Sequence, residues 1–215
     1  MNWTERIEDY TNFLRTEKSL SEKSIEAYLT DIKKLVDFNE LKYQLPPEEI
    51  KQKHIQELLS YIFDLGLSER SQARILSGIK SFYHYLLLED VVMDDPTELI
   101  DSPKLSRKLP DVLTTNEIES LLNAIDLSKA EGHRNKAIIE TLYSCGLRVS
   151  ELINLKLSHL FFKEGFIKVI GKGDKERLVP IGKRAVEQIE IYLQQRKLLP
   201  YKKEFEDIVF LNRRG

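Results

Sequence analysis

The sequence has little cysteine, little histidine and no long apolar run, and each scarcity removes a class of protein. The single cysteine, Cys145, cannot form an internal disulfide, and one cysteine with four scattered histidines makes no zinc cluster. No apolar stretch is long enough to span a bilayer. The first residues lack the basic and then apolar segments of a secretory signal. We therefore expect a cytoplasmic protein.

The sequence also lacks an overall excess of basic residues, but its net charge of −2 hides an asymmetry. Residues 1–103 hold 12 lysines and arginines against 20 aspartates and glutamates, whereas residues 104–215 hold 21 against 15. A basic second half is typical of a protein that binds a polyanion. An ordinary solvated surface has a similar excess, so the charge alone does not decide.

The first half has the apolar spacing of four amphipathic helices joined by short connections. Residues 3–18 form the first helix, and Ser21 begins the second as an N-cap. Pro46 and Pro47 are expected to open the third helix, because proline is tolerated in a first helical turn. Ser68 caps the fourth helix, so this half is predicted to be a small helical bundle.

Residues 94–110 contain three prolines among charged side chains, and each proline disfavours helix at the residue before it. The sign of the charge also changes across this segment. We predict a helical domain over residues 1–93, a linker over residues 94–110 and a second domain over residues 111–215.

The second domain is expected to mix helices with a β-hairpin. Thr114 and Glu117 fit a capping box, and Gly146 ends a later helix. In chain order, the predicted elements are a helix through Leu121 and Leu122, a helix over 134–145, a short helix from Ser150, strands over 166–170 and 177–180, a helix near 184–197 and an unassigned segment at 208–211.

Three segments are candidates for chemistry or binding. Gly146 places Arg148 at the start of the next helix, where its guanidinium can face a phosphate; alternatively, Arg148 is a surface residue paired with Glu151. Lys172 stands between two glycines at the hairpin tip, as a point charge or proton donor; alternatively, this is a solvent-exposed turn. The turn lacks the spacing of a nucleotide-binding phosphate loop.

The third segment is the polar face of the fourth helix. Arg70, Arg74, Ser77 and, more loosely, Lys80 share one side of it. That stripe fits a DNA groove or an ordinary solvated face equally well.

Together these segments resemble the tyrosine recombinase (phage integrase-like) family, Xer type. Residues 146–152 (GLRVSEL) resemble the family's first catalytic-arginine box, and residues 170–180 (IGKGDKERLVP) resemble its catalytic-lysine hairpin. Residues 20–28 resemble the start of the core-binding domain, and residues 95–110 resemble the interdomain linker, with wording closest to the XerD branch. The resemblance implies a mainly α fold with a small β component. A four-helix, SAM-like core-binding bundle would precede an incomplete mixed α+β catalytic domain.

The resemblance implies a site-specific recombinase that cuts and rejoins DNA through a 3′-phosphotyrosyl intermediate, without metal or nucleotide cofactor. Arg148 would stabilise the phosphate charge, and Lys172 would protonate the departing 5′-oxygen. Expected partners are a double-stranded recombination site and a second Xer-type recombinase or another copy, as a tetramer on two sites. A division-site DNA translocase and a role in chromosome dimer resolution are further expectations.

The resemblance also implies DNA contacts from the bundle, the linker and the hairpin. The expected residues are Lys23, Ser24, Tyr28, Ser71, Arg74, Ser77, Lys80, Lys104, Arg107, Lys175 and Arg177.

The rest of the family's catalytic set has no match in this sequence. It comprises a His-x-x-Arg box, a further His or Trp and the tyrosine nucleophile. All four histidines precede Lys172, and Tyr192 and Tyr201 come too early. We therefore expect a chain that stops before its nucleophile and is inactive alone. Two other hypotheses remain. The chain could be a non-catalytic, sequence-specific DNA-binding protein, or a protein-interaction helical module with an unrelated hairpin.

Overall fold

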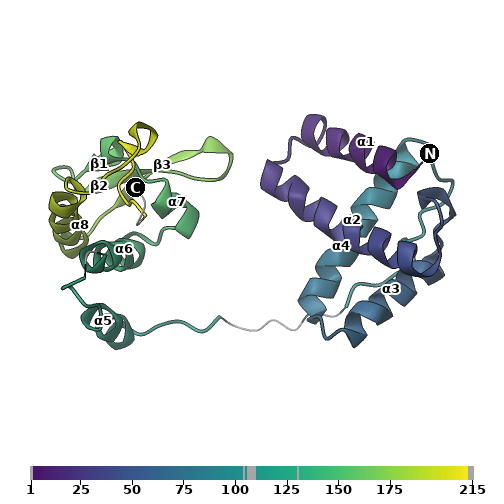
Figure 1. The fold of residues 1–215 in the computed structure, drawn as a ribbon, viewed down its shortest axis with the longest axis horizontal. Helices are drawn as coiled ribbons and strands as arrows, with labels where there is room; N and C mark the ends of the chain where they lie inside the picture. Colours follow the sequence, from purple (N-terminus) through teal and green to yellow (C-terminus); the bar gives the residue numbers. More distant parts are fainter. Residues whose placement is uncertain (1, 104, 106–109, 130, 213–215) are drawn as a thin grey trace. The chain divides into compact units, whose positions relative to one another are not determined.

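The structure is a computed structural model that describes residues 2–103, 105, 110–129 and 131–212. It divides into two compact units, Met1–Leu109 and Pro110–Gly215. The chain is mainly helical with one small sheet, which confirms the predicted fold class (Figure 1). None of the described helices combines the length and the apolar character that crossing a membrane requires.

The first unit is a bundle of four helices. Ser21 and Ser68 accept hydrogen bonds from the backbone N–H groups of Ser24 and Ser71, so both predicted N-caps are confirmed. The helices are α1 (Trp3–Thr16), α2 (Glu22–Lys42), α3 (Gln52–Asp64) and α4 (Glu69–Leu88).

The expected start of the third helix at the two prolines is wrong. Pro47 opens a separate 3₁₀ turn, η1 (Pro47–Glu49), and α3 begins only after Lys51. Ile50 ends the turn in an extended conformation, and its side chain is buried in the bundle core. The fixed φ of proline suits the first turn of either helix type, so the local signal did not separate them.

The bundle core is apolar and aromatic. The side chains of Tyr10, Ile32 and Phe82 are fully buried, and the rings of Tyr10 and Phe82 meet edge to face. Burial on this scale, at roughly 25 cal/mol per Å² of apolar surface, is what holds the four helices together. It fixes which faces of α2 and α4 remain at the surface.

The second unit packs helices against a three-stranded antiparallel sheet in the order β1-β2-β3. Its core includes Ile167 and Val169 of the central strand and Ile189 of the last helix. The elements are α5 (Thr115–Asn123), α6 (Gly132–Cys145), α7 (Val149–Ile153), η2 (Leu157–His159), β1 (Leu160–Phe161), β2 (Phe166–Ile170), η3 (Lys172–Asp174), β3 (Glu176–Pro180), α8 (Lys183–Arg196) and η4 (Lys203–Phe205).

Two features of this unit lay outside the sequence expectations. Strand β1 is only two residues long, and Leu160 pairs with Ile167 on the edge of the predicted hairpin. The unassigned segment at 208–211 enters the core: the N–H of Val209 donates to the carbonyl of Leu155 at 2.8 Å. Phe210 stacks on Tyr192 at a ring-centroid distance of 5.6 Å.

Candidate functional site

Arg148 stands at the junction of two helices. Gly146 ends α6 in the left-handed conformation, with φ of 58°, which glycine adopts at little cost. Arg148 then occupies the N-cap of α7, and 75% of its side chain is exposed. The turn therefore directs a guanidinium outward from a fixed backbone position.

Glu151 connects this arginine to the β-hairpin. Its carboxylate accepts hydrogen bonds from the backbone N–H of Arg148 at 2.8 Å and from Arg148 Nη1 at 3.0 Å. It also accepts two from Arg177 on β3, at 2.7 Å from Nη1 and 2.9 Å from Nη2. Only 3% of the Glu151 side chain is exposed. One buried carboxylate thus ties together the arginine segment and the lysine hairpin.

These contacts set the ionisation of Glu151. The Arg177 guanidinium, followed by the Arg148 backbone N–H, lowers the pKa of Glu151 from its ordinary value of 4.5 to about 2, although burial acts in the opposite direction. The carboxylate is therefore ionised throughout the physiological range.

The hairpin tip brings Lys172 to the same region. The N–H of Gly171 donates to the carbonyl of Lys175 at 2.8 Å, closing a turn in which Gly173 has φ of 71°. A Cβ on Gly171 would lie 3.3 Å from Arg177 Nη1 and 3.5 Å from Glu151 Oε1, so glycine lets this ion pair pack against the turn. For Lys172 the structure describes the backbone alone.

An open pocket lies between α7 and the hairpin. It joins the two segments that the sequence singled out separately, and it adds an exposed lysine, Lys156, that sequence reasoning missed. Its lining is Arg148, Ser150, Glu151, Asn154, Lys156, Ile170, Gly171, Asp174 and Ile208. One guanidinium fork and one lysine beside hydroxyl and amide groups suit the oxygens of a phosphate diester.

We predict that replacing Glu151 with Gln destabilises the chain by about 1 to 3 kcal/mol at neutral pH, because the depressed pKa reflects folded-state pairs that solvent partly screens. A carboxylate with a lowered folded pKa contributes stability above its ordinary pKa of 4.5 and loses it as the pH falls through about 2. The gap between parent and variant urea midpoints should therefore close over that window. Glu187, exposed on α8, gives the control: Glu187→Gln should show a small gap that does not change with pH. A constant gap for Glu151→Gln would contradict the assigned pKa.

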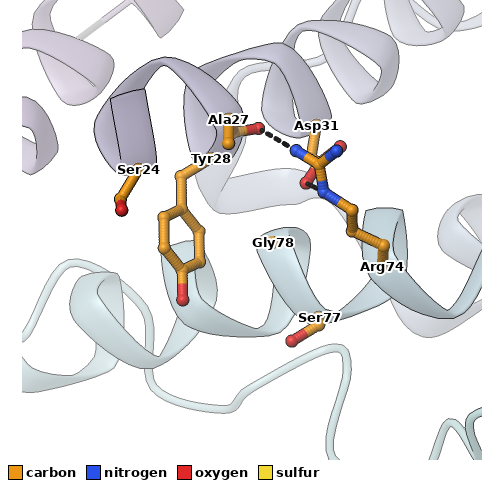
Figure 2. Close-up of a pocket in the computed structure, with 7 residues that line it drawn as sticks. All are labelled: Ser24, Ala27, Tyr28, Asp31, Arg74, Ser77 and Gly78. Atoms are coloured by element: carbon orange, nitrogen blue, oxygen red, sulfur yellow. Dashed lines mark hydrogen bonds and ion pairs between the residues drawn. The ribbon is translucent and has the colours of Figure 1, made fainter. Parts of the chain in front are cut away.

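In the first unit, four of the expected DNA-contacting residues line one pocket. Ser24 and Tyr28 come from α2, and Arg74 and Ser77 come from α4 (Figure 2). Sequence reasoning missed Asp31, a carboxylate at the base of this pocket that is 5% exposed. The signal was available, since a charged residue falls within the apolar stripe of α2.

Five other expected contacts are described, and none of them lines this pocket. Lys23 and Ser71 are exposed, and Lys80 is partly buried. Lys175 and Arg177 are exposed on the hairpin, where Arg177 is held by Glu151. Lys104 and Arg107 lie outside the described residues.

The two tyrosines in the last part of the chain have structural contacts. Tyr192 is buried, its hydroxyl accepts a hydrogen bond from the N–H of Leu211 at 3.1 Å, and burial raises its pKa. Tyr201 lies under the guanidinium of Arg196, 4.9 Å from its ring centroid. Neither residue lines the pocket between α7 and the hairpin. Among the described residues no group of three or more His, Cys, Asp or Glu side chains is arranged to hold a metal ion.

Comparison with protein-family models gives two matches. The phage integrase family model matches residues 111–215, and the phage integrase N-terminal SAM-like domain model matches residues 7–90. Among curated proteins, tyrosine recombinase XerD of Staphylococcus aureus is 41% identical over 209 residues, which cover 97% of this chain and 71% of that protein. XerD of Staphylococcus saprophyticus is 42% identical over the same shares of the two chains.

Solved structures show the same fold. A lambda integrase dimer bound to a COC′ core site matches with a TM-score of 0.74 and 18% identity, over all of this chain and 58% of that one. A XerH recombinase bound to a palindromic difH substrate, in a post-cleavage complex, matches with a TM-score of 0.69 and 23% identity, over 97% and 61% of the two chains. This chain thus spans about three fifths of these two solved chains.

Proposed function

Because the chain belongs to the Xer-type tyrosine recombinases of the phage integrase family, a family of DNA strand-exchange enzymes, we propose that it acts in site-specific cutting and rejoining of DNA through a 3′-phosphotyrosyl intermediate. The observation that supports this function most directly is the position of the Glu151 carboxylate. It binds both Arg148 and Arg177 of the lysine hairpin, so the two segments line the same pocket.

The proposed chemistry is a transesterification. A tyrosine hydroxyl releases its proton to solvent as its oxygen attacks the phosphorus of a backbone diester, the bond from phosphorus to the 5′-oxygen breaks, and the phosphate becomes linked to the tyrosine. Arg148 donates hydrogen bonds to the non-bridging oxygens, where negative charge develops. Lys172 gives a proton to the departing 5′-oxygen, and the free 5′-hydroxyl later reverses the reaction on a new strand.

The hydrogen bond to Glu151 fixes the orientation in which the Arg148 guanidinium would meet the phosphate. One terminal nitrogen, Nη1, is held by Glu151, while most of the side chain is exposed. A fork that is already fixed at one edge loses less rotational freedom when it meets a phosphate. The same carboxylate accepts a hydrogen bond from Arg177 on β3, the return strand of the hairpin, so α7 stays joined to the hairpin backbone.

The relatives support a wider setting on paired DNA sites. We propose that the bundle and the second unit both contact a double-stranded recombination site. Four protomers, of this chain or of this chain with a second Xer-type recombinase, would assemble on two such sites. A lambda integrase tetramer bound to a Holliday junction has the same fold, which supports this assembly. We further propose that the recombinase resolves chromosome dimers at cell division. It would do so in the cytoplasm, together with a division-site DNA translocase.

Covalent trapping tests the chemistry. On a nicked suicide substrate, the full gene product should accumulate a phosphotyrosyl adduct that resists denaturation. A polypeptide of residues 1–215 should form none, because none of its tyrosines stands in the sequence context of the family's nucleophile. An adduct on residues 1–215 would show that the motif assignment is wrong.

The alternative function is non-catalytic, sequence-specific DNA binding. It is supported by the hydroxyl-lined pocket between α2 and α4, which could contact DNA without any of the residues proposed for strand cleavage. The same trapping experiment separates the two functions. A gene product that binds a selected duplex tightly but never forms an adduct is a binder.

Both functions require DNA binding, and we expect it to be steeply sensitive to salt. Several lysines and arginines would displace condensed counterions, so the logarithm of affinity should fall by roughly 0.9 per phosphate contact for each unit of log salt. Fluorescence anisotropy with a labelled duplex over a salt series measures this slope. An affinity that does not change from low to moderate salt would contradict the proposed DNA binding.

A further inference from the structure

Arg74 is held in place by two contacts that do not involve any of the pocket's hydroxyl groups. Its Nε lies 3.5 Å from Asp31 Oδ2, and its Nη2 donates to the carbonyl of Ala27 at 3.3 Å. Figure 2 shows the side chain leaving α4 and placing its guanidinium beside the Asp31 carboxylate of α2. No hydrogen bond from Nη1 is found among the described residues.

The burial of the Asp31 carboxylate favours its pairing with Arg74. The side chain of Asp31 is 7% exposed, whereas that of Arg74 is 59% exposed. An ionised carboxylate that is this buried is costly without a cation, so Asp31 stabilises a guanidinium beside it. Burial raises the pKa of Asp31 and Arg74 opposes that shift, as a paired carboxylate requires.

The backbone is built around this carboxylate. A Cβ on Gly78 would lie 2.6 Å from the Cβ of Asp31, so the absence of a side chain on Gly78 lets α4 approach α2 at this point. Asp31 consequently sits beneath the pocket rather than at its rim. The helices, and not the flexible arm of the arginine, determine where the guanidinium is anchored.

Charge in the pocket points to the kind of contact it makes. Asp31 and Arg74 are the two charged residues among those that line it, and their charges cancel. A pocket of zero net charge gains little from counterion release, which dominates non-specific binding to phosphates. It still offers N–H groups and the hydroxyls of Ser24, Tyr28 and Ser77 for hydrogen bonds. Such a surface suits a contact that depends on geometry and therefore on sequence.

We propose that Asp31 is a positioning residue for DNA recognition: it holds Arg74 by its Nε edge, so that the remaining N–H groups meet the DNA in one orientation and discriminate between sequences. The inference rests on the proposed DNA binding. Removing the carboxylate would leave an unpaired guanidinium in the pocket. That cation would bind phosphates of any sequence more tightly and would discriminate less between sequences.

The test compares two duplexes, one enriched from a random pool by the parent protein and one with the same composition in scrambled order. In the full gene product, Asp31→Asn should raise affinity for the scrambled duplex by roughly twofold to tenfold, the range of one ion pair near a surface. It should steepen the salt slope on that duplex by about one phosphate contact. The preference for the selected duplex should fall by a similar factor.

Two further variants identify the route. If Asp31 acts through Arg74, then in an Arg74→Ala background Asp31→Asn should change the affinity for both duplexes by the same factor and leave the preference unchanged. Asp37→Asn removes the same charge from an exposed position of α2 that does not line this pocket, and should leave the preference unchanged.

Arg74→Lys covers the case in which Asp31→Asn does not fold. Lysine keeps the charge but cannot hold Asp31 and the Ala27 carbonyl with one planar fork, so the preference should fall while the salt slope stays. The proposal is overturned, while DNA binding stands, if Arg74→Lys retains the preference or if Asp31→Asn still changes the preference in the absence of Arg74. A parent protein that binds neither duplex would instead overturn the proposed function.

Discussion

Replacing Arg148 with Ala in the full gene product should slow DNA cleavage by roughly 10³–10⁵-fold, or about 4–7 kcal/mol of barrier. The reason is geometric as well as electrostatic. Arg148 is fixed at the N-cap of α7, and its outer edge is exposed to the pocket beside the hairpin. A fork held in that position stabilises charge on the non-bridging oxygens without reorganising. Single-turnover cleavage of a suicide substrate at saturating protein measures the chemical step.

Binding and folding controls accompany this measurement. Affinity for the duplex should change little, since one cation among many is lost. Arg184 provides a matched control, because it is also an exposed arginine paired with a buried glutamate, Glu140, at 2.9 Å. Arg184→Ala should cleave at the parent rate. If Arg148→Ala also cleaves at the parent rate, Arg148 is a surface arginine that only pairs with Glu151.

Local signals in the sequence were enough to predict most of the helices. Ser21 and Ser68 act as caps where expected, and Gly146 ends α6 with the left-handed backbone that a C-terminal glycine implies. These signals act over one helical turn, so the chain carries them in adjacent residues. The prolines at 46 and 47 misled for the same reason, because one turn of sequence does not distinguish a 3₁₀ turn from the start of an α-helix.

The β-hairpin was predictable, but its third strand was not. Residues 166–170 and 176–180 carry enough β-forming residues around a glycine turn to define a pair. Strand β1 has two residues, too few for any periodicity, and exists because Leu160 finds Ile167 on the hairpin's edge. The core position of Val209 likewise depends on a backbone bond to Leu155, far away in the sequence.

The candidate sites show the same division between local and long-range information. Arg148 and the segment around Lys172 stood out by their glycines and their order in the chain. Their connection through Glu151 and Arg177 did not, since no local rule relates a helix residue to a strand residue 26 positions later. Asp31 itself left a local signal in the apolar stripe of α2, but its pairing with Arg74 on another helix did not. Buried ion pairs between distant segments are visible only after folding.

Lys172 is the subject of the second large effect. Replacing it with Ala should slow cleavage by about 10²–10⁴-fold, the range for loss of a general acid. Its place at the tip of a turn closed by the Gly171 to Lys175 hydrogen bond puts the residue beside the pocket that holds Arg148. Lys163, an exposed lysine in the turn before β2, gives the matched control and should be neutral on replacement with Ala.

A substrate with sulfur in place of the 5′-bridging oxygen separates proton donation from simple charge. A thiolate departs without being protonated, so the Lys172→Ala defect should shrink strongly on this substrate if the lysine is the acid. The Arg148→Ala defect should persist, because the non-bridging oxygens are unchanged. A Lys172→Ala defect of equal size on both substrates would make the lysine an electrostatic contact and place the acid on another residue. A variant that cleaves both substrates at the parent rate would identify the hairpin tip as an ordinary solvated turn.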